Sequence, residues 1–201
     1  MLEIPVDLPA ELVPLSWLVG TWEGTGVIDY RVGDDTVTHE FGQRVQFAHD
    51  GQPVLQYSSV AWLLDAPDGA ARELPSEIGY WRLARQLGDG DAGPGMLPAS
   101  APTAYGDAES VETLRKDAEG FDLQVQLVHP DGVGELYLGR VAGPRIDLAT
   151  DAVVRAEGAK PYAAATRLYG LVESHLLWAW DIAALGQDLR THASARLAKV
   201  G

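Results

Sequence analysis

Strict alternation of apolar and polar side chains is the strongest local signal along this chain. The pattern is clearest over residues 121–127, where the apolar members are Phe121, Leu123, Val125 and Leu127. Successive side chains of a β-strand point to opposite faces, so this stretch predicts a strand with one buried and one solvated face.

The same pattern recurs along most of the chain and predicts about ten short strands. Their expected ranges are 21–32, 36–48, 54–64, 74–85, 111–115, 121–127, 136–141, 145–154, 162–172 and 176–184. Tight turns such as Asp50-Gly51 and Pro130-Asp131-Gly132 separate many of them. A meander of this kind removes its exposed edges by closing into an antiparallel up-and-down barrel, an all-β, lipocalin-like fold whose interior can hold one small ligand.

Two segments depart from the alternation. Residues 9–19 carry apolar residues at a spacing that suits a turn or two of helix, interrupted by Pro14, and predict a short helical cap at one end of the barrel. Residues 88–108 are rich in Gly, Pro, Ala and Asp and predict a long mobile loop between neighbouring strands. Residues 1–201 are expected to form one domain, because barrels of this size commonly stay single.

The most distinctive stretch is Gly20-Thr21-Trp22-Glu23-Gly24-Thr25-Gly26. Alternation places the indole of Trp22 and the glycines on the same face of a strand. We interpret the indole as a plug at the barrel floor, with space beside Gly24 and Gly26 where a flat ligand can approach the backbone. The alternative is that these glycines only let the strand bend sharply.

Composition narrows the possible partners. The net charge of -14 and the pI near 4.6 argue against nucleic acid or an anionic membrane surface, because phosphate contacts need clustered Lys and Arg. Cysteine is absent, which excludes disulfides and thiolate chemistry. The first residues lack the basic start and apolar run of a signal peptide, and no apolar stretch reaches spanning length, so a cytoplasmic protein is expected.

Five histidines are the best candidates for chemistry, because the chain lacks the spacings of serine hydrolases, zinc proteases and phosphate-binding loops. His49 and His129 fall in predicted turns and His175 follows one, so all three are expected to be solvated. His39 lies on the apolar face of its strand and is expected to be a hydrogen-bonded core residue. His192 follows the last predicted strand, and the pattern alone makes it a surface residue.

Four segments together resemble the nitrobindin family. They are the glycine and tryptophan motif, residues 47–53, residues 76–80, and the tail from Gly186-Gln187 through His192 to Leu197, in the order that the family has. The resemblance implies a ten-stranded antiparallel barrel, similar to fatty-acid-binding proteins, that holds a b-type haem, mostly ferric, near one open end. His192 matches the family's axial histidine, and Lys160 matches a lysine that lies close to the haem.

The resemblance also implies a function, which is reversible binding of nitric oxide and conversion of peroxynitrite to nitrate. His192 would then be the iron ligand and catalytic centre, and Lys160 would screen the haem propionates. This chain departs from the family pattern at Pro75, where many members have a histidine, and at Tyr30-Arg31-Val32, where members often have Tyr-Pro-Thr. The sequence does not reveal which acceptor fixes the tautomer of His192.

Two other functions are compatible with a hollow barrel. A haem-free carrier of a fatty acid or another small apolar molecule would use inward Arg and Tyr pairs, and Arg167 and Tyr169 alternate onto one face of a predicted strand. A structural or interaction barrel would have a filled interior without any cavity.

Overall fold

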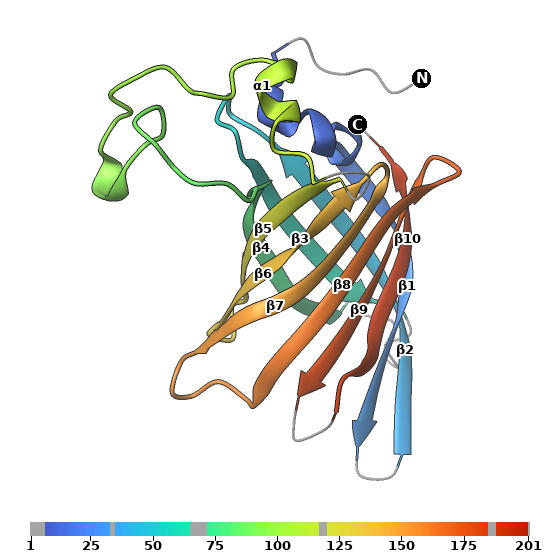
Figure 1. Ribbon diagram of the computed structural model, residues 1–201. Coiled ribbons are helices and arrows are strands. Elements are labelled where there is room, and N and C mark those ends of the chain that lie inside the picture. The colour runs from blue at the N-terminus through green and yellow to red at the C-terminus, as the bar shows by residue number, and fades with distance from the viewer. Residues whose placement is uncertain (1–6, 33–34, 65–71, 117–119, 185–187, 201) are drawn as a thin grey trace.

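The structure, a computed structural model, describes residues 7–32, 35–64, 72–116, 120–184 and 188–200. Ten antiparallel strands form one closed barrel, in which each strand pairs with the next along the chain and the last pairs with the first (Figure 1). The strands are β1 (Gly20–Val32), β2 (Asp35–Ala48), β3 (Leu55–Leu63), β4 (Arg72–Leu83), β5 (Phe121–Val128), β6 (Val133–Ala142), β7 (Arg145–Arg155), β8 (Tyr162–Val172), β9 (His175–Ala184) and β10 (Arg190–Lys199). The predicted all-β antiparallel barrel is confirmed.

One end of the barrel is covered by η1 (Ala10–Leu18) and α1 (Ala108–Glu112), two short helices that contact each other (Figure 1). The first, a 3-10 helix, buries Leu12, Leu15 and Leu18 completely. The carbonyl of Leu18 accepts a hydrogen bond of 2.7 Å from Nε1 of Trp22, whose side chain is only 1% exposed. The predicted helical cap and the tryptophan plug are therefore both confirmed.

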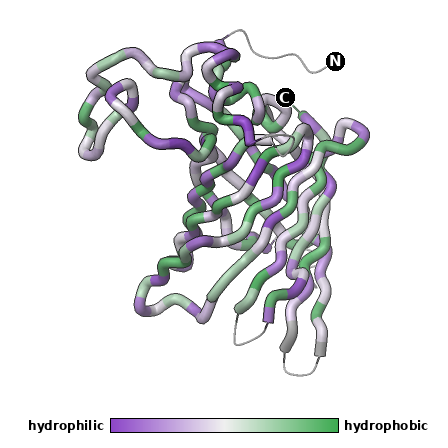
Figure 2. Tube along the Cα trace, in the orientation of Figure 1, coloured by the Kyte–Doolittle hydropathy of each residue, from purple (hydrophilic) through white to green (hydrophobic). Residues whose placement is uncertain are grey.

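Hydropathy alternates along the strands, as Figure 2 shows by its change of colour from one residue to the next. The strand β5 illustrates the burial that results, since every second side chain of Phe121–Val128 is buried. Within the described ranges, no helix combines the length and the apolar character that a membrane span requires.

One predicted strand is wrong, and one strand of the barrel was not predicted. Residues 111–115 do not form a strand, because the first two of them are the end of the α-helix α1 (Ala108–Glu112). A capping box starts this helix, and in it the side chain of Asp107 accepts from the backbone of Ser110 at 2.8 Å. The tenth strand is instead β10, which closes the barrel against β1. Its inward residues include Ala193 and Ala195, whose small side chains give a weak alternation signal.

The glycines of the tryptophan motif do not leave space for a ligand, which corrects that interpretation. A Cβ added to Gly24 would lie 2.2 Å from the carbonyl oxygen of Arg196, and one added to Gly26 would lie 2.3 Å from that of Ser194. Both contacts are to the backbone of β10. The glycines therefore let β1 and β10 approach closely where the barrel closes.

Because these contacts involve backbone atoms, Gly24→Ala is expected to destabilise the apoprotein by about 1–3 kcal/mol, the usual cost of overpacking. The free energy of unfolding in urea measures the effect. Gly88→Ala is the matched control, since a Cβ added at Gly88 meets nothing within 4 Å. Equal stability of the two variants would contradict the assigned role of Gly24.

The predicted loop over residues 88–108 does connect neighbouring strands, β4 and β5. It contains the 3-10 helix η2 (Pro94–Met96). The side chain of Arg85, only 2% exposed, donates to both carboxylate oxygens of Glu11 at 2.6 and 2.7 Å and to those of Asp91 at 2.8 and 2.7 Å. These hydrogen bonds lower the pKa of Asp91 to about 2 and tie the start of the loop to η1. Its mobility stays a prediction.

Candidate functional site

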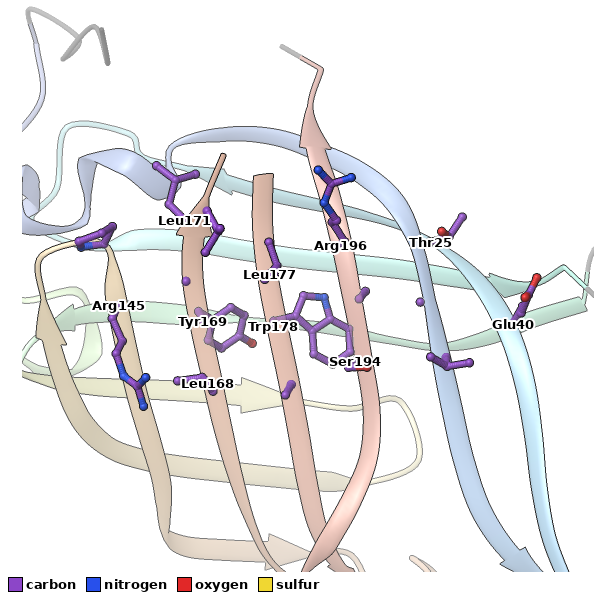
Figure 3. A pocket seen from close by; sticks show the side chains of 17 residues that line it. Thr25, Glu40, Arg145, Leu168, Tyr169, Leu171, Leu177, Trp178, Ser194 and Arg196 are labelled. Atoms are coloured by element: carbon purple, nitrogen blue, oxygen red, sulfur yellow. The ribbon is translucent and has the colours of Figure 1, made fainter. Parts of the chain in front are cut away.

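Two pockets are candidates for the functional site. The larger, about 850 Å³, lies on the outer wall across β7 to β10, β1 and β2, where Leu168, Arg196 and Thr25 are exposed (Figure 3). It is an open groove, and no histidine lines it. The second hollow, about 240 Å³, lies inside the barrel and is lined by two histidines and a buried ion pair. We take this interior cavity as the candidate site because it holds the groups that can do chemistry.

Most of the cavity wall is apolar or aromatic. These wall residues are Ile28, Phe41, Tyr57, Ala61, Leu74, Pro75, Val133, Tyr162, Tyr169, Trp178, Trp180, Ile182 and Ala193. Gln43 accepts a hydrogen bond of 2.8 Å from Nε1 of Trp178 and donates one of 2.9 Å to Ser59, so these polar groups of the wall are paired with each other. The presence of the cavity contradicts the alternative of a barrel with a filled interior.

His192 reaches the cavity because β10 contains a β-bulge. Thr191 pairs with Asp181 and Ala193 pairs with Trp180, so His192 is an extra residue opposite β9. A bulge redirects the side chains beside it. Ala193 is buried and His192 also lines the cavity, although strict alternation would place them on opposite faces. The interpretation of His192 as a surface residue is therefore wrong.

The tautomer of His192 is fixed by the backbone of β1. Nδ1 lies 3.0 Å from the carbonyl oxygen of Asp29, just beyond the last β1–β10 pair, Ile28 with Ala193. A carbonyl only accepts, so Nδ1 carries the proton and Nε2 keeps its lone pair. Burial lowers the pKa of His192 despite this hydrogen bond. The lowered pKa favours the neutral imidazole, which is the form that binds a metal.

Trp180 stands at the centre of the polar part of the wall. Its ring meets that of His192 edge-on, with the centroids 5.3 Å apart, and is nearly parallel to that of His129 at 6.1 Å. The guanidinium of Arg167 lies 4.3 Å from the centroid of the same indole. Trp180 therefore contacts His192 as well as two members of a buried charged cluster, His129 and Arg167.

The centre of that cluster is an ion pair between Glu77 on β4 and Arg167 on β8. The guanidinium, 2% exposed, donates to both carboxylate oxygens at 2.6 and 2.9 Å and also to the hydroxyl of Tyr137 at 3.1 Å. Tyr57 donates to the same carboxylate at 2.9 Å. Burial opposes ionisation of Glu77, but the charge and hydrogen bonds of Arg167 outweigh it and lower the pKa to about 2.

His129 belongs to this cluster, which corrects its assignment as a solvated turn residue. Its side chain is 9% exposed and its Nε2 lies 2.7 Å from Oε2 of Glu135, a fully buried carboxylate. Glu135 also accepts from the hydroxyls of Tyr137, at 2.6 Å, and Tyr162. Burial alone would lower the pKa of His129, but the bond to Glu135 and the charge of Glu77 raise it.

The other predicted site residues lie away from the cavity wall. Lys160 is exposed between β7 and β8, two residues before the cavity-lining Tyr162, and its carbonyl accepts from Arg155 at 3.3 Å. His175 bonds the carbonyl of Glu173 at 2.8 Å in an exposed turn. The dipeptide Gly186-Gln187 of the tail motif lies outside the described residues.

Among the described residues, no group of three or more His, Cys, Asp or Glu side chains is arranged to hold a metal ion. A haem needs no such group, because the porphyrin supplies most ligands of its iron and a single histidine can hold it.

Comparison with known proteins agrees with this geometry. The family model for the THAP4-like, heme-binding beta-barrel domain matches residues 11–199 of this chain. A peroxynitrite isomerase of Leifsonia xyli subsp. xyli is 70% identical over 199 residues, which are 99% of each chain. A second, of Clavibacter michiganensis subsp. michiganensis, is 63% identical over the whole of both chains. The crystal structure of Rv2717c from M. tuberculosis is similar with a TM-score of 0.66 and 27% identity, over 96% of this chain and 99% of that one.

Proposed function

We propose, from the premise that this chain belongs to the THAP4-like, heme-binding β-barrel family, that it isomerises peroxynitrite to nitrate at a ferric haem b whose iron is held by His192. The family match also confirms the resemblance to nitrobindins. The observation that carries the proposal is the imidazole of His192, which lines the cavity with Nδ1 committed to the carbonyl of Asp29 and Nε2 able to bind iron.

The cavity wall fits a haem in its chemistry. Aromatic and aliphatic side chains provide the apolar surface that a macrocycle needs, and burial of apolar area contributes about 25 cal/mol per Å². The enclosed volume of about 240 Å³ is below the roughly 300–1,000 Å³ of pockets that bury a drug-sized ligand. We therefore expect the macrocycle to be enclosed only in part.

The protein's own contribution is to position the group and to exclude water. When bound, a ferric haem supplies a Lewis acid with a coordination position for a small oxidant. His192 would hold the iron, the carbonyl of Asp29 would orient the imidazole, and the ring of Trp180 would limit its rotation. The apolar wall would exclude water from the reacting oxidant.

Further parts of the proposal concern the surroundings of the haem. Lys160, exposed beside Tyr162, is proposed to screen the propionates. Reversible binding of nitric oxide is proposed at the same iron. A cytoplasmic location stays a prediction.

The haem-free carrier is disfavoured by the pairing of Arg167. Arg167 and Tyr169 do lie on one inward face of β8, as the sequence predicts, and both are buried. The guanidinium is already bound through two nitrogens to the carboxylate of Glu77. It is therefore not available to receive the carboxylate of a fatty acid.

The proposed reaction predicts that haem-loaded protein speeds the decay of peroxynitrite in proportion to its concentration and yields nitrate. Stopped-flow absorbance and nitrate analysis measure the two effects, with apoprotein and free haemin as controls. Acceleration no greater than that of an equal amount of free haemin would contradict the proposal. Lipid extraction of the purified protein with mass spectrometry tests the carrier in the same preparation.

A further inference from the structure

Backbone hydrogen bonds close the turn that carries His129. The backbone N–H of His129 bonds the carbonyl of Val133 at 2.9 Å, and the carbonyl of His129 accepts from Gly132 at 3.2 Å. The imidazole ring of His129 stacks on the indole ring of Trp180, with an angle of 11° between the two ring planes. His129 therefore lines the cavity together with His192, and both rings contact the indole of Trp180.

The two ring nitrogens of His129 have different surroundings. Nε2 is committed to Glu135 at 2.7 Å. Nδ1 lies 3.7 Å from Oε1 of Glu77, which is longer than a hydrogen bond. Two carboxylates thus favour the imidazolium form. The ring lines the cavity, and its Nδ1 N–H is not hydrogen-bonded to Glu77.

The proton on His129 sets the charge of the interior cluster. The titratable and charged groups around the ring are Glu77 on β4, Glu135 on β6, Tyr162 and Arg167 on β8, and the exposed Asp131 of its own turn. Two buried carboxylates face one buried guanidinium, so the buried cluster is neutral only while His129 is protonated. Loss of that proton leaves a net negative charge that opposes an incoming anion.

We propose that His129 is a specificity-determining residue of the cavity: its imidazolium donates to small anions and favours them over neutral ligands of the same haem. The inference rests on the proposed haem site and assigns it a preference for anionic ligands. The raised pKa of His129 extends this preference towards neutral pH, and the preference is lost as pH rises through that pKa.

The test compares an anionic and a neutral ligand on one ferric protein. Azide and nitric oxide are titrated into haem-loaded wild type and His129→Gln between about pH 6 and pH 9, and the ratio of their affinities is taken at each pH. The ratio cancels competition from hydroxide at the iron, because both ligands must displace it. His49→Gln, a histidine outside the cavity wall, is the control.

At the lower pH, His129→Gln is expected to weaken azide binding about tenfold while the affinity for nitric oxide changes little, because a charge-assisted donor is lost. In wild type, the ratio should fall with rising pH, with its midpoint at the pKa of His129 measured by NMR. A ratio that is flat with pH in wild type would overturn the inference even if the variant does not fold. Equal loss of both ligands in the variant would also overturn it.

A separate measurement shows whether the protein binds haem at all. Haem loading is measured first from the Soret band, before any ligand is added. Wild type that takes up no haem would overturn the proposed function and this inference together, whereas normal loading with no preference for azide would overturn only the role of His129.

Discussion

Replacing His192 by alanine is expected to abolish the Soret spectrum of a histidine-ligated haem and to weaken haemin binding about 100-fold or more. Loss even of a group that only orients a metal ligand typically costs 10–100-fold in affinity, and His192 would be the ligand itself. The apolar wall would retain some haem, so residual binding with an altered spectrum is expected. Titration of apoprotein with haemin, followed at the Soret band, measures both the affinity and the ligation.

Two controls separate iron ligation from a structural role. His49→Ala removes a histidine that does not line the cavity and should leave the spectrum unchanged. Added imidazole should restore the wild-type band in His192→Ala, because the side chain that is removed leaves space for a free imidazole. A wild-type spectrum in His192→Ala without imidazole would remove His192 from its proposed role.

The barrel was predictable because alternation is a local property. A strand such as Phe121–Val128 shows its buried face directly in the sequence, and its range agrees with the prediction within one residue. The exception is β10, where small inward residues such as Ala193 and Ala195 carry little contrast with their neighbours. Its identity as a strand depends on pairing with β1, which no local pattern shows.

The position of His192 was not accessible to the same reasoning. Alternation from Ala193 onward places its side chain outside, and the extra residue that reverses this is a property of the β9–β10 register. Only the resemblance to a family pointed to His192. A histidine beside a run of small residues gives no physical signal of a bulge.

The burial of Glu77 was missed for a related reason. In the segment Ser76-Glu77-Ile78-Gly79-Tyr80, Ile78 and Tyr80 are 59% and 53% exposed, whereas Glu77 is 9% exposed. Hydrophobicity alone predicts the reverse. The carboxylate is stabilised inside by Arg167, which lies 90 residues later in the chain, and a partner at that separation leaves no trace in a local pattern.

The ion pair between Glu77 and Arg167 is expected to contribute strongly to the stability of the folded protein. Glu77→Gln is expected to destabilise the apoprotein by about 3–5 kcal/mol, because it leaves the guanidinium of Arg167 buried without its charged partner. Urea unfolding at neutral pH measures the loss. The surface pair of Arg145 with Asp147 is the matched control: its geometry is similar at 2.7 Å, but its side chains are 62% and 59% exposed. Arg145→Gln should cost about 1 kcal/mol or less.

The contribution of the Glu77–Arg167 pair can also be measured from the pH dependence of the free energy of unfolding. The pKa of Glu77 falls from 4.5 to about 2 on folding, so its stabilising contribution is fully present above the unfolded value and is lost as pH drops towards 2. Glu77→Gln should therefore lose less stability than wild type between about pH 5 and pH 2.

Replacing both partners, as Glu77→Leu with Arg167→Leu, should recover much of the loss at neutral pH, since no buried charge is left unpaired. Recovery should be incomplete because the hydroxyl of Tyr57, which donates to Glu77, would lose its acceptor. A double variant that is less stable than Glu77→Gln would show that the pair acts through other contacts.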